Sequence, residues 1–208
     1  MVRASQRPIR FHRFAWSGHC HRVELLLSLL DLPVEPVDVN LGAGEQKTPA
    51  FLALNPLGQV PVIQDGALTL ADSNAILTYL ATRYGGARWM PATSELLAEQ
   101  QRWFSLAAGP LASGPAAARA HVLFGSAVDL PATQARAHAL LRFMDAHLAS
   151  RDFLVGGELG LADVSHYAYV ARSPEGGVSL DEYASVRAWL SRVEATPRFV
   201  PMPERRAA

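Results

Sequence analysis

Up to about Tyr84, short apolar runs alternate with stretches in which apolar residues recur at helical spacing. The short runs predict strands at residues 9–14, 34–39, 60–63 and 68–70. The helical spacing predicts helices from Ser17 to Pro33, near 49–54 and from Asp72 to Tyr84. Asp65-Gly66, between the last two runs, is the strongest hairpin signal in the chain. The pattern βαβαββα therefore predicts an α/β domain over residues 1–85.

The pattern changes after a linker, which its glycines and proline predict at residues 86–92. Residues 93–208 contain almost nothing that reads as a strand, and helical spacing predicts helices at 94–108, 132–148, 163–171 and 181–194. Two Gly-Pro pairs, Gly109-Pro110 and Gly114-Pro115, predict that 107–120 consists of helix ends and a loop. We therefore expect an all-helical second domain.

Composition narrows the classes of protein. Of the 208 residues, 50% are hydrophobic and 18% are charged, which excludes general disorder. The 19 basic and 19 acidic residues balance, so we expect no nucleic-acid partner. No apolar run approaches a membrane span, and residues 1–11 lack the apolar core of a secretory signal. A single cysteine, Cys20, points to a reducing, cytoplasmic location.

Candidate chemistry lies at three places in the first domain. Ser17-Gly18-His19-Cys20 stands where a strand turns into a helix, and Asp72-Ser73 begins another helix, so both can bind an anion. Val60-Pro61 begins a strand, and a cis bond there would expose the Val60 backbone to a peptide-like ligand. His19-Cys20-His21 cannot converge on one metal ion, because consecutive helical residues point about 100° apart. We therefore expect no metal.

Several runs carry a resemblance to a known family. They are Asn55-Pro56-Leu57-Gly58-Gln59-Val60-Pro61, Asp65-Gly66, and Leu70-Ala71-Asp72-Ser73-Asn74-Ala75-Ile76-Leu77-Thr78-Tyr79-Leu80, followed by Gly156-Gly157 and Leu161-Ala162-Asp163. Over residues 8–200 the chain resembles the soluble glutathione S-transferases, of the theta- or zeta-like bacterial type with a serine at the thiol site.

The resemblance implies a thioredoxin-like domain that binds glutathione and a helical domain that supplies most of the second-substrate pocket. Ser17 matches the serine that hydrogen-bonds the glutathione sulfur. Val60 matches the residue whose backbone pairs with the cysteinyl part, with Pro61 as a cis proline. Asp72 and Ser73 match the pair that holds the γ-glutamyl amine and carboxylate. Two further positions match glutathione contacts in a variable loop region: Gln46, where theta-like enzymes contact the glycine carboxylate, and Gln59.

Each of these assignments has a plainer alternative. Ser17 can be only a helix cap, and Cys20 reads as a small buried hydrophobe rather than a nucleophile. Ser17-x-x-Cys20 lacks the first cysteine of a dithiol motif, so a dithiol cycle is not expected. Asp163 reads as structural, and Gly160 stands where relatives usually have a Ser or Thr cap. Three residues line either the second-substrate cleft or the core: Arg102, Trp103 and His121.

The resemblance predicts an enzyme that transfers glutathione to a small, hydrophobic electrophile. The alternatives are a glutathione-dependent disulfide or peroxide reductase or isomerase on the same fold, or a non-catalytic glutathione-binding scaffold. Proteins of this kind are usually homodimers, and Leu96, Leu97 and Phe104 on the helix from Ser94 give apolar surface for a partner. The same groups can instead pack within one chain.

Overall fold

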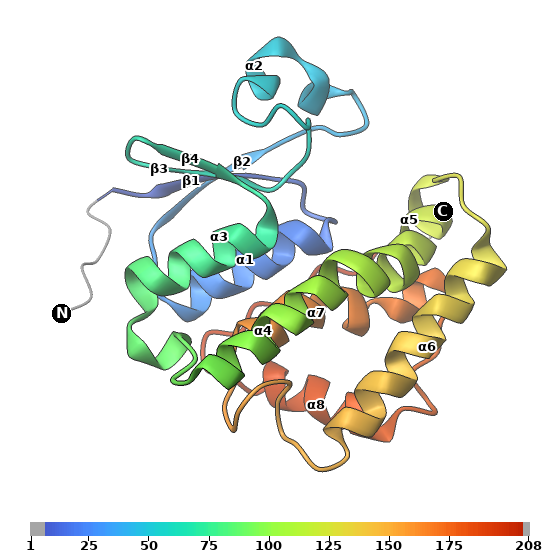
Figure 1. Cartoon of the computed structure of the whole chain (residues 1–208). Coiled ribbons are helices and arrows are strands. Elements are labelled where there is room, and N and C mark those ends of the chain that lie inside the picture. The colour runs from blue at the N-terminus through green and yellow to red at the C-terminus, as the bar shows by residue number, and fades with distance from the viewer. Residues whose placement is uncertain (1–6, 206–208) are drawn as a thin grey trace. The chain divides into compact units, whose positions relative to one another are not determined.

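The computed structural model describes residues 7–205 and divides into two compact units (Figure 1). Unit 1 comprises the chain up to Met90 together with Pro197–Met202. Unit 2 comprises Pro91–Thr196 and the residues from Pro203 onward. We expect no secretory signal in residues 1–11. Residues 1–6 of that segment lie outside the described residues. Among the described residues, no helix combines the length and apolar character that a membrane span requires.

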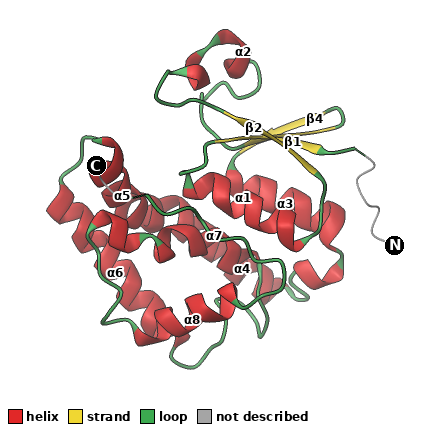
Figure 2. Cartoon of the chain, turned by 180° about the vertical axis from the view of Figure 1, so that it is seen from behind, coloured by secondary structure: helices red, strands yellow, loops and turns green. Residues whose placement is uncertain are grey.

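Unit 1 is built on a four-stranded mixed sheet (Figure 2). Its strands, in the spatial order β2-β1-β3-β4, are β2 (Val34–Asp38), β1 (Ile9–Arg13), β3 (Val62–Asp65) and β4 (Leu68–Ala71). β1 and β2 are parallel, whereas β3 is antiparallel to both β1 and β4. Asp65 pairs with Leu68, which leaves a two-residue turn whose Gly66 has φ +59°. A positive φ suits glycine, so Gly66 can take the first of the two turn positions while Asp65 ends β3.

Helices cover both faces of this sheet. α1 (Gly18–Leu29) and α3 (Ser73–Leu80) lie side by side on one face, and α3 continues as a π-helical turn to Gly85 (Figure 1). The short α2 (Pro49–Leu52) lies beyond the opposite face, where its Phe51 packs with Val39 and Val62. The main core of the unit consists of fully buried apolar side chains from the strands and from α1 and α3: Ile9, Phe11, Val23, Leu26, Leu27, Ile63, Ile76, Leu77 and Leu80.

The regular elements of unit 2 among its described residues are all helices. Its helices are α4 (Ser94–Leu106), α5 (Ala117–Phe124), α6 (Leu130–Leu148), α7 (Leu161–Ala171) and α8 (Ala184–Glu194). Every residue of α7 up to Val170 is buried, which makes it the central helix of the unit. The fold is therefore an α/β unit and an all-helical unit, as the sequence pattern predicts, and the α/β unit is thioredoxin-like, as the resemblance implies.

The prediction of a loop at 107–120 is wrong. Residues Ala107–Ala116 form a π-helical segment that joins α4 to α5, so the chain stays helical from Ser94 to Phe124. Pro110 and Pro115 lie inside this segment. A proline has no N–H to donate and its ring crowds the carbonyl four residues earlier, and the wider π-helical turn relieves both conflicts without ending the helix.

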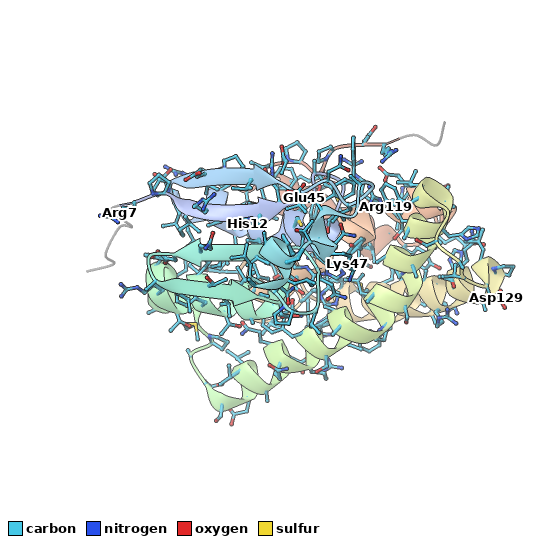
Figure 3. All side chains as sticks on the ribbon, turned by 90° about the horizontal axis from the view of Figure 1, so that it is seen from above. Arg7, His12, Glu45, Lys47, Arg119 and Asp129 are labelled. Atoms are coloured by element: carbon cyan, nitrogen blue, oxygen red, sulfur yellow. The ribbon has the colours of Figure 1, made fainter. Side chains whose placement is uncertain are left out.

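The predicted start of the last helix is also displaced. α8 begins at Ala184 rather than near 181, because the Asp145 carboxylate on α6 accepts hydrogen bonds from the N–H groups of Ser185 (2.8 Å) and Val186 (3.0 Å). α6 begins at Leu130, two residues before its predicted start, where Asp129 (labelled in Figure 3) caps it by accepting from the Ala132 N–H at 3.0 Å. The α8 cap comes from a residue about 40 positions away, which local sequence cannot reveal.

Candidate functional site

A cavity of about 450 Å³ lies within unit 1. Its volume falls in the range of small-molecule sites. It brings together all seven positions that the resemblance assigns to glutathione: Ser17, Gln46, Gln59, Val60, Pro61, Asp72 and Ser73. The remaining lining residues are His19, Leu41, Asn55, Leu57, Gly58 and Ala71. The cavity therefore collects the start of α1, the start of α3 and the loop that leads into β3.

Ser17 is the N-cap of α1, and its side-chain oxygen accepts the Cys20 N–H at 3.3 Å. A serine hydroxyl accepts and donates at the same time, so this cap leaves the O–H of Ser17 able to donate. The positive end of the α1 dipole lies at the same point. Ser17 thus serves as a cap and still offers a donor to an anion in the cavity.

The loop before β3 is held by Asn55, which is only 5% exposed. Its Nδ2 donates to the Gln59 carbonyl (2.8 Å), and its Oδ1 accepts the Leu57 N–H (3.1 Å). The Val60–Pro61 peptide bond that follows is cis. Val60 precedes the first paired residue of β3, so its backbone lies outside the ladder and lines the cavity.

Asp72 and Ser73 present the N-terminus of α3 to the cavity. Asp72 has φ +70°, and its Oδ1 accepts the N–H groups of Asn74 (3.0 Å) and Ala75 (2.9 Å). A positive φ outside glycine is a strained conformation that recurs at ligand sites. Ser73 is buried in the first turn, so this corner combines a carboxylate, a hydroxyl and a positive helix end.

Gln46 lines the cavity from the 3₁₀ turn Glu45–Lys47, whose first and last residues are labelled in Figure 3. Its Oε1 is buried and has no hydrogen-bond partner within the described part of the chain. The turn lies close to the loop before β3, since the Lys47 Nζ donates to the Leu57 carbonyl at 3.3 Å and a Cβ on Gly58 would come within 2.8 Å of the Gln46 carbonyl oxygen. Gly58 also has φ +61°, so both space and conformation favour glycine there.

Two residues of the site were missed by the sequence reasoning. Arg22 on α1 is 1% exposed, and its Nη1 donates to the Ser73 Oγ and to the Asn74 Oδ1, each at 3.1 Å. His19 lines the cavity, and burial together with the charge of Arg22 lowers its pKa to about 3, so its imidazole is neutral at pH 7. The sequence carries no local signal for Arg22, because its partner Ser73 lies 51 residues away.

Comparison with known proteins decides the family. Residues 10–82 match the model of the glutathione S-transferase N-terminal domain, and residues 110–197 match that of the C-terminal domain. The chain is 33% identical to glutathione S-transferase 3 of Zea mays, over 94% of this chain and 96% of the relative. The chain belongs to the glutathione S-transferase family. The theta-like character expected from the sequence agrees with 30% identity to glutathione S-transferase theta-1 of Mus musculus, over 86% of this chain and 79% of the relative.

Solved structures of the family share the architecture. A glutathione S-transferase from Pseudomonas fluorescens matches with a TM-score of 0.90 and 31% identity, over 95% of this chain and all of that one (100%). A glutathione transferase homologue from Drosophila mojavensis, solved with bound glutathione, matches with a TM-score of 0.81 and 26% identity, over 91% of this chain and 89% of that one. Both agree with the fold class predicted from the sequence.

Cys20 is not placed for thiol chemistry in this glutathione S-transferase. It is 1% exposed, and burial raises the pKa of its thiol to about 11. The Phe14 N–H points to its Sγ at 3.4 Å. The neighbouring histidines point in other directions. His19 lines the cavity, and the His21 Nε2 is hydrogen-bonded to the Val200 carbonyl at 2.9 Å. The three consecutive residues thus diverge, as their helical spacing predicts.

The three residues considered for the second substrate lie in different surroundings. Arg102 lines a separate cavity of about 690 Å³ within unit 2, together with Phe143. Trp103 is 0% exposed, with the rings of His147 and His166 against it at about 5 Å. His121 lines neither of the two cavities, and its Nδ1 meets the Ser126 carbonyl at 2.7 Å. Unit 2 therefore does not assemble these three into one site.

Proposed function

We propose that this protein is a glutathione transferase that binds glutathione in the unit 1 cavity and stabilises its thiolate for attack on a small electrophile. The observation that carries the proposal is that one cavity contains the N-termini of two helices, α1 and α3, and the backbone of Val60, which lies just before β3 and pairs with no other strand among the described residues. Glutathione has two carboxylates, an amine, a thiol and two amide bonds. Each of these groups finds a complementary feature among the residues that line the cavity.

The γ-glutamyl end fits the corner at the start of α3. There the Asp72 carboxylate binds the amine, and the Ser73 hydroxyl donates to the carboxylate, which the positive end of the α3 dipole also attracts. The cysteinyl part pairs with the backbone of Val60 beside the cis Pro61. The glycine end lies toward Gln46 and Gln59, and the buried Gln46 Oε1, an acceptor, is able to accept the N–H of the glycyl amide. The relative from Drosophila mojavensis, which holds glutathione, supports this ligand.

Ser17 stabilises the sulfur anion in this arrangement. A free thiol of this kind has a pKa near ~8.5, so little thiolate exists at neutral pH. Lowering that pKa by ~2 units requires about 2.7 kcal/mol of preferential stabilisation of the anion. One charge-assisted hydrogen bond from the Ser17 O–H supplies ~1.5–3 kcal/mol, and the N-terminus of α1 supplies ~0.3–1 kcal/mol. The two together are of the required size.

The reaction is then a displacement or an addition at the electrophile. The thiolate sulfur forms a bond to the electrophilic carbon, and in a displacement the leaving group departs with the electron pair of its broken bond. We assign glutathione binding to residues 1–85, the linker to 86–92 and most second-substrate contacts to the helical residues 93–208. The apolar lining of the unit 2 cavity, which includes Leu106 and Leu140, favours a small hydrophobic electrophile.

We further propose that the protein is a homodimer that works in the cytoplasm. Both units carry large apolar side chains that are exposed in the single chain: Leu57 (72%) and Leu68 (36%) in unit 1, Leu97 (49%) and Phe143 (41%) in unit 2. In this homodimer the partner subunit covers Leu97 on α4. The single buried cysteine fits a reducing compartment.

Binding and turnover test the proposal in two steps. The protein should be retained on immobilised glutathione and released by free glutathione, and failure to bind would contradict the proposal. The bound protein is then assayed with an aryl halide, a hydroperoxide and a mixed disulfide. We expect conjugation of the aryl halide. Turnover of only the disulfide or the peroxide would indicate a reductase, and binding without turnover of any of the three would indicate a scaffold.

A further inference from the structure

Arg22 connects the two helix starts of the glutathione cavity. Its side chain leaves α1 and reaches the first turn of α3, where Nη1 donates to the Ser73 Oγ and the Asn74 Oδ1 at 3.1 Å each. The side chain is 1% exposed, so its cationic charge is held in a medium of lower polarity than water. Electrostatic effects reach farther in such a medium.

The direction of this hydrogen bond determines what Ser73 can do. A guanidinium only donates, so the Ser73 Oγ accepts from Arg22 and the O–H of Ser73 points to another acceptor. Ser73 lines the cavity, where the acceptor would be a ligand carboxylate. A serine that accepts from a cation is also a stronger donor, because hydrogen bonds in a chain polarise one another.

The charge of Arg22 also acts on the cavity itself. His19 lines the cavity, and after burial the charge of Arg22 is the next cause that lowers the pKa of its imidazole. The positive charge of Arg22 disfavours a protonated His19, and by the same electrostatic effect it favours an anionic ligand group in the cavity. This charge adds to the positive end of the α3 dipole beside Ser73.

We propose that Arg22 is a positioning residue that makes the Ser73 corner selective for the α-carboxylate of the γ-glutamyl group. It acts by fixing the Ser73 hydroxyl as a donor and by placing a buried positive charge behind it. The inference rests on the proposed function, because it assumes that glutathione binds with its γ-glutamyl end at α3.

The test compares two ligands that differ only in that carboxylate. Calorimetry measures the Kd of glutathione and of γ-aminobutyryl-cysteinyl-glycine, which lacks the α-carboxylate. The ratio of the two values is the carboxylate preference. We expect Arg22→Met to lower this preference on the order of tenfold, mainly by weakening glutathione. Arg22→Gln, a shorter neutral variant that keeps an amide donor, should lower it too and carries the test if Arg22→Met does not fold.

Two further variants separate positioning from structural support. Ser73→Ala should lower the preference, and adding Arg22→Met to it should lower the preference by less than Arg22→Met does alone, because the part of the Arg22 effect that passes through Ser73 is already lost. Arg13→Met is the matched control. Arg13 lies at the end of β1, pairs with Asp38 and with Glu24 on α1, and is not among the residues that line the cavity. This substitution removes the same charge and should leave the preference unchanged.

Three outcomes would overturn the inference. A folded Arg22 variant with the wild-type preference contradicts it, and so does one that loses affinity for both ligands equally, because that indicates structural support alone. Full additivity of the Arg22 and Ser73 substitutions contradicts action through Ser73. A wild-type protein that binds neither ligand overturns the proposed function itself, so the two failures are distinguishable.

Discussion

Two serines at helix starts use their hydroxyl groups in the same way. The Ser17 oxygen accepts the Cys20 N–H and the Ser73 oxygen accepts the Arg22 guanidinium, so each keeps its own O–H for a ligand. Neither serine has to give up its structural bond in order to bind an anion. A helix cap and a catalytic donor are therefore compatible functions of one side chain, and the two interpretations of Ser17 do not compete.

The carboxylate of Asp72 also has two functions, which substitutions can separate. Asp72→Asn keeps a side-chain oxygen for the N–H groups of Asn74 and Ala75 and tolerates φ +70°, so the free energy of unfolding should change little. It loses the negative charge that we propose binds the amine, so KM for glutathione should rise about tenfold or more. Asp72→Ala should raise KM similarly and also cost about 1 kcal/mol of stability. Steady-state kinetics and urea unfolding measure the two effects, and an unchanged KM in both variants would exclude Asp72 from binding.

At the scale of single residues, the sequence predicted positions whose signal is local. Ser17, Val60 and Asp72 each lie at a helix or strand start that neighbouring residues mark, and the cavity contains all of them. Arg22 was not predicted, because its partner Ser73 lies 51 residues away. A long-range hydrogen bond leaves no pattern in a single sequence.

At the scale of elements, the segment Ala107–Ala116 shows how small residues shape a helix. It contains two Gly-Pro pairs and remains helical as a π-helix. Gly114 approaches α6 so closely that a Cβ there would lie 2.9 Å from the Ala137 N and 3.1 Å from the Ala137 Cα. These are backbone atoms, which cannot turn aside as a flexible side chain can.

Gly114→Ala should therefore destabilise unit 2 by about 1–3 kcal/mol, because α6 has to move to admit the methyl group. Gly109→Ala is the matched control in the same segment, where a Cβ meets nothing within 4 Å. There alanine should be neutral or stabilise by about 0.4–1 kcal/mol. Urea unfolding followed by circular dichroism measures both, and equal stabilities would show that α6 does not pack this closely on the π-helix.

The start of α7 depends on Asp163, which is fully buried. Its Oδ1 accepts from the Leu154 N–H (2.9 Å) and the Trp189 Nε1–H (2.8 Å), and its Oδ2 accepts the Gly160 N–H (2.9 Å). These bonds stabilise the ionised form, although burial raises the pKa of Asp163 to about 6. The Asp163 bond to Gly160 also explains how α7 begins without the Ser or Thr cap of relatives.

Asp163→Ala should lower the free energy of unfolding by about 3 kcal/mol or more, because it leaves three buried N–H groups without an acceptor. Asp163→Asn keeps one acceptor oxygen and should lose less. Thermal and urea unfolding compare the two. A stability equal to wild type in Asp163→Ala would mean that water replaces the carboxylate and that the aspartate is not structural.

Sequence patterns predicted the type of nearly every element. They missed features that do not follow from local α-helix and strand rules. The hairpin at Gly66 follows from turn chemistry, and the four strands of unit 1 follow from their short apolar runs. The continuous helix through Pro110 and Pro115 was missed because proline rules describe α-helices, not π-helices. The start of α8 was missed because its cap, Asp145, lies on α6.

At the scale of the whole molecule, the exposed apolar side chains predict a homodimer. Twice the chain mass of 22.5 kDa gives about 45 kDa. Leu97 on α4 is 49% exposed, and a two-fold interface would introduce any charge placed there twice. Leu97→Glu should therefore weaken the dimer while leaving glutathione binding in unit 1 unchanged.

Multi-angle light scattering at micromolar concentration tests this prediction. We expect a mass near 45 kDa for the wild type and a shift toward 22.5 kDa for Leu97→Glu. A wild-type monomer would contradict the dimer. A dimer that Leu97→Glu leaves intact would contradict only the choice of face, and the exposed Phe143 on α6 would be the next position to test.

The pKa of the glutathione thiol bound to this protein tests the central claim most directly. Ultraviolet absorbance of the thiolate is titrated with pH in the wild type, in Ser17→Ala and in Ser17→Thr, which keeps both the hydroxyl and the cap. We expect the wild type and Ser17→Thr to hold the bound thiol about two units below its free value of ~8.5, and Ser17→Ala to raise the pKa by about a unit or more while affinity for glutathione changes little. The same thiol pKa in the wild type and in Ser17→Ala would contradict the assignment of Ser17 as the group that stabilises the thiolate.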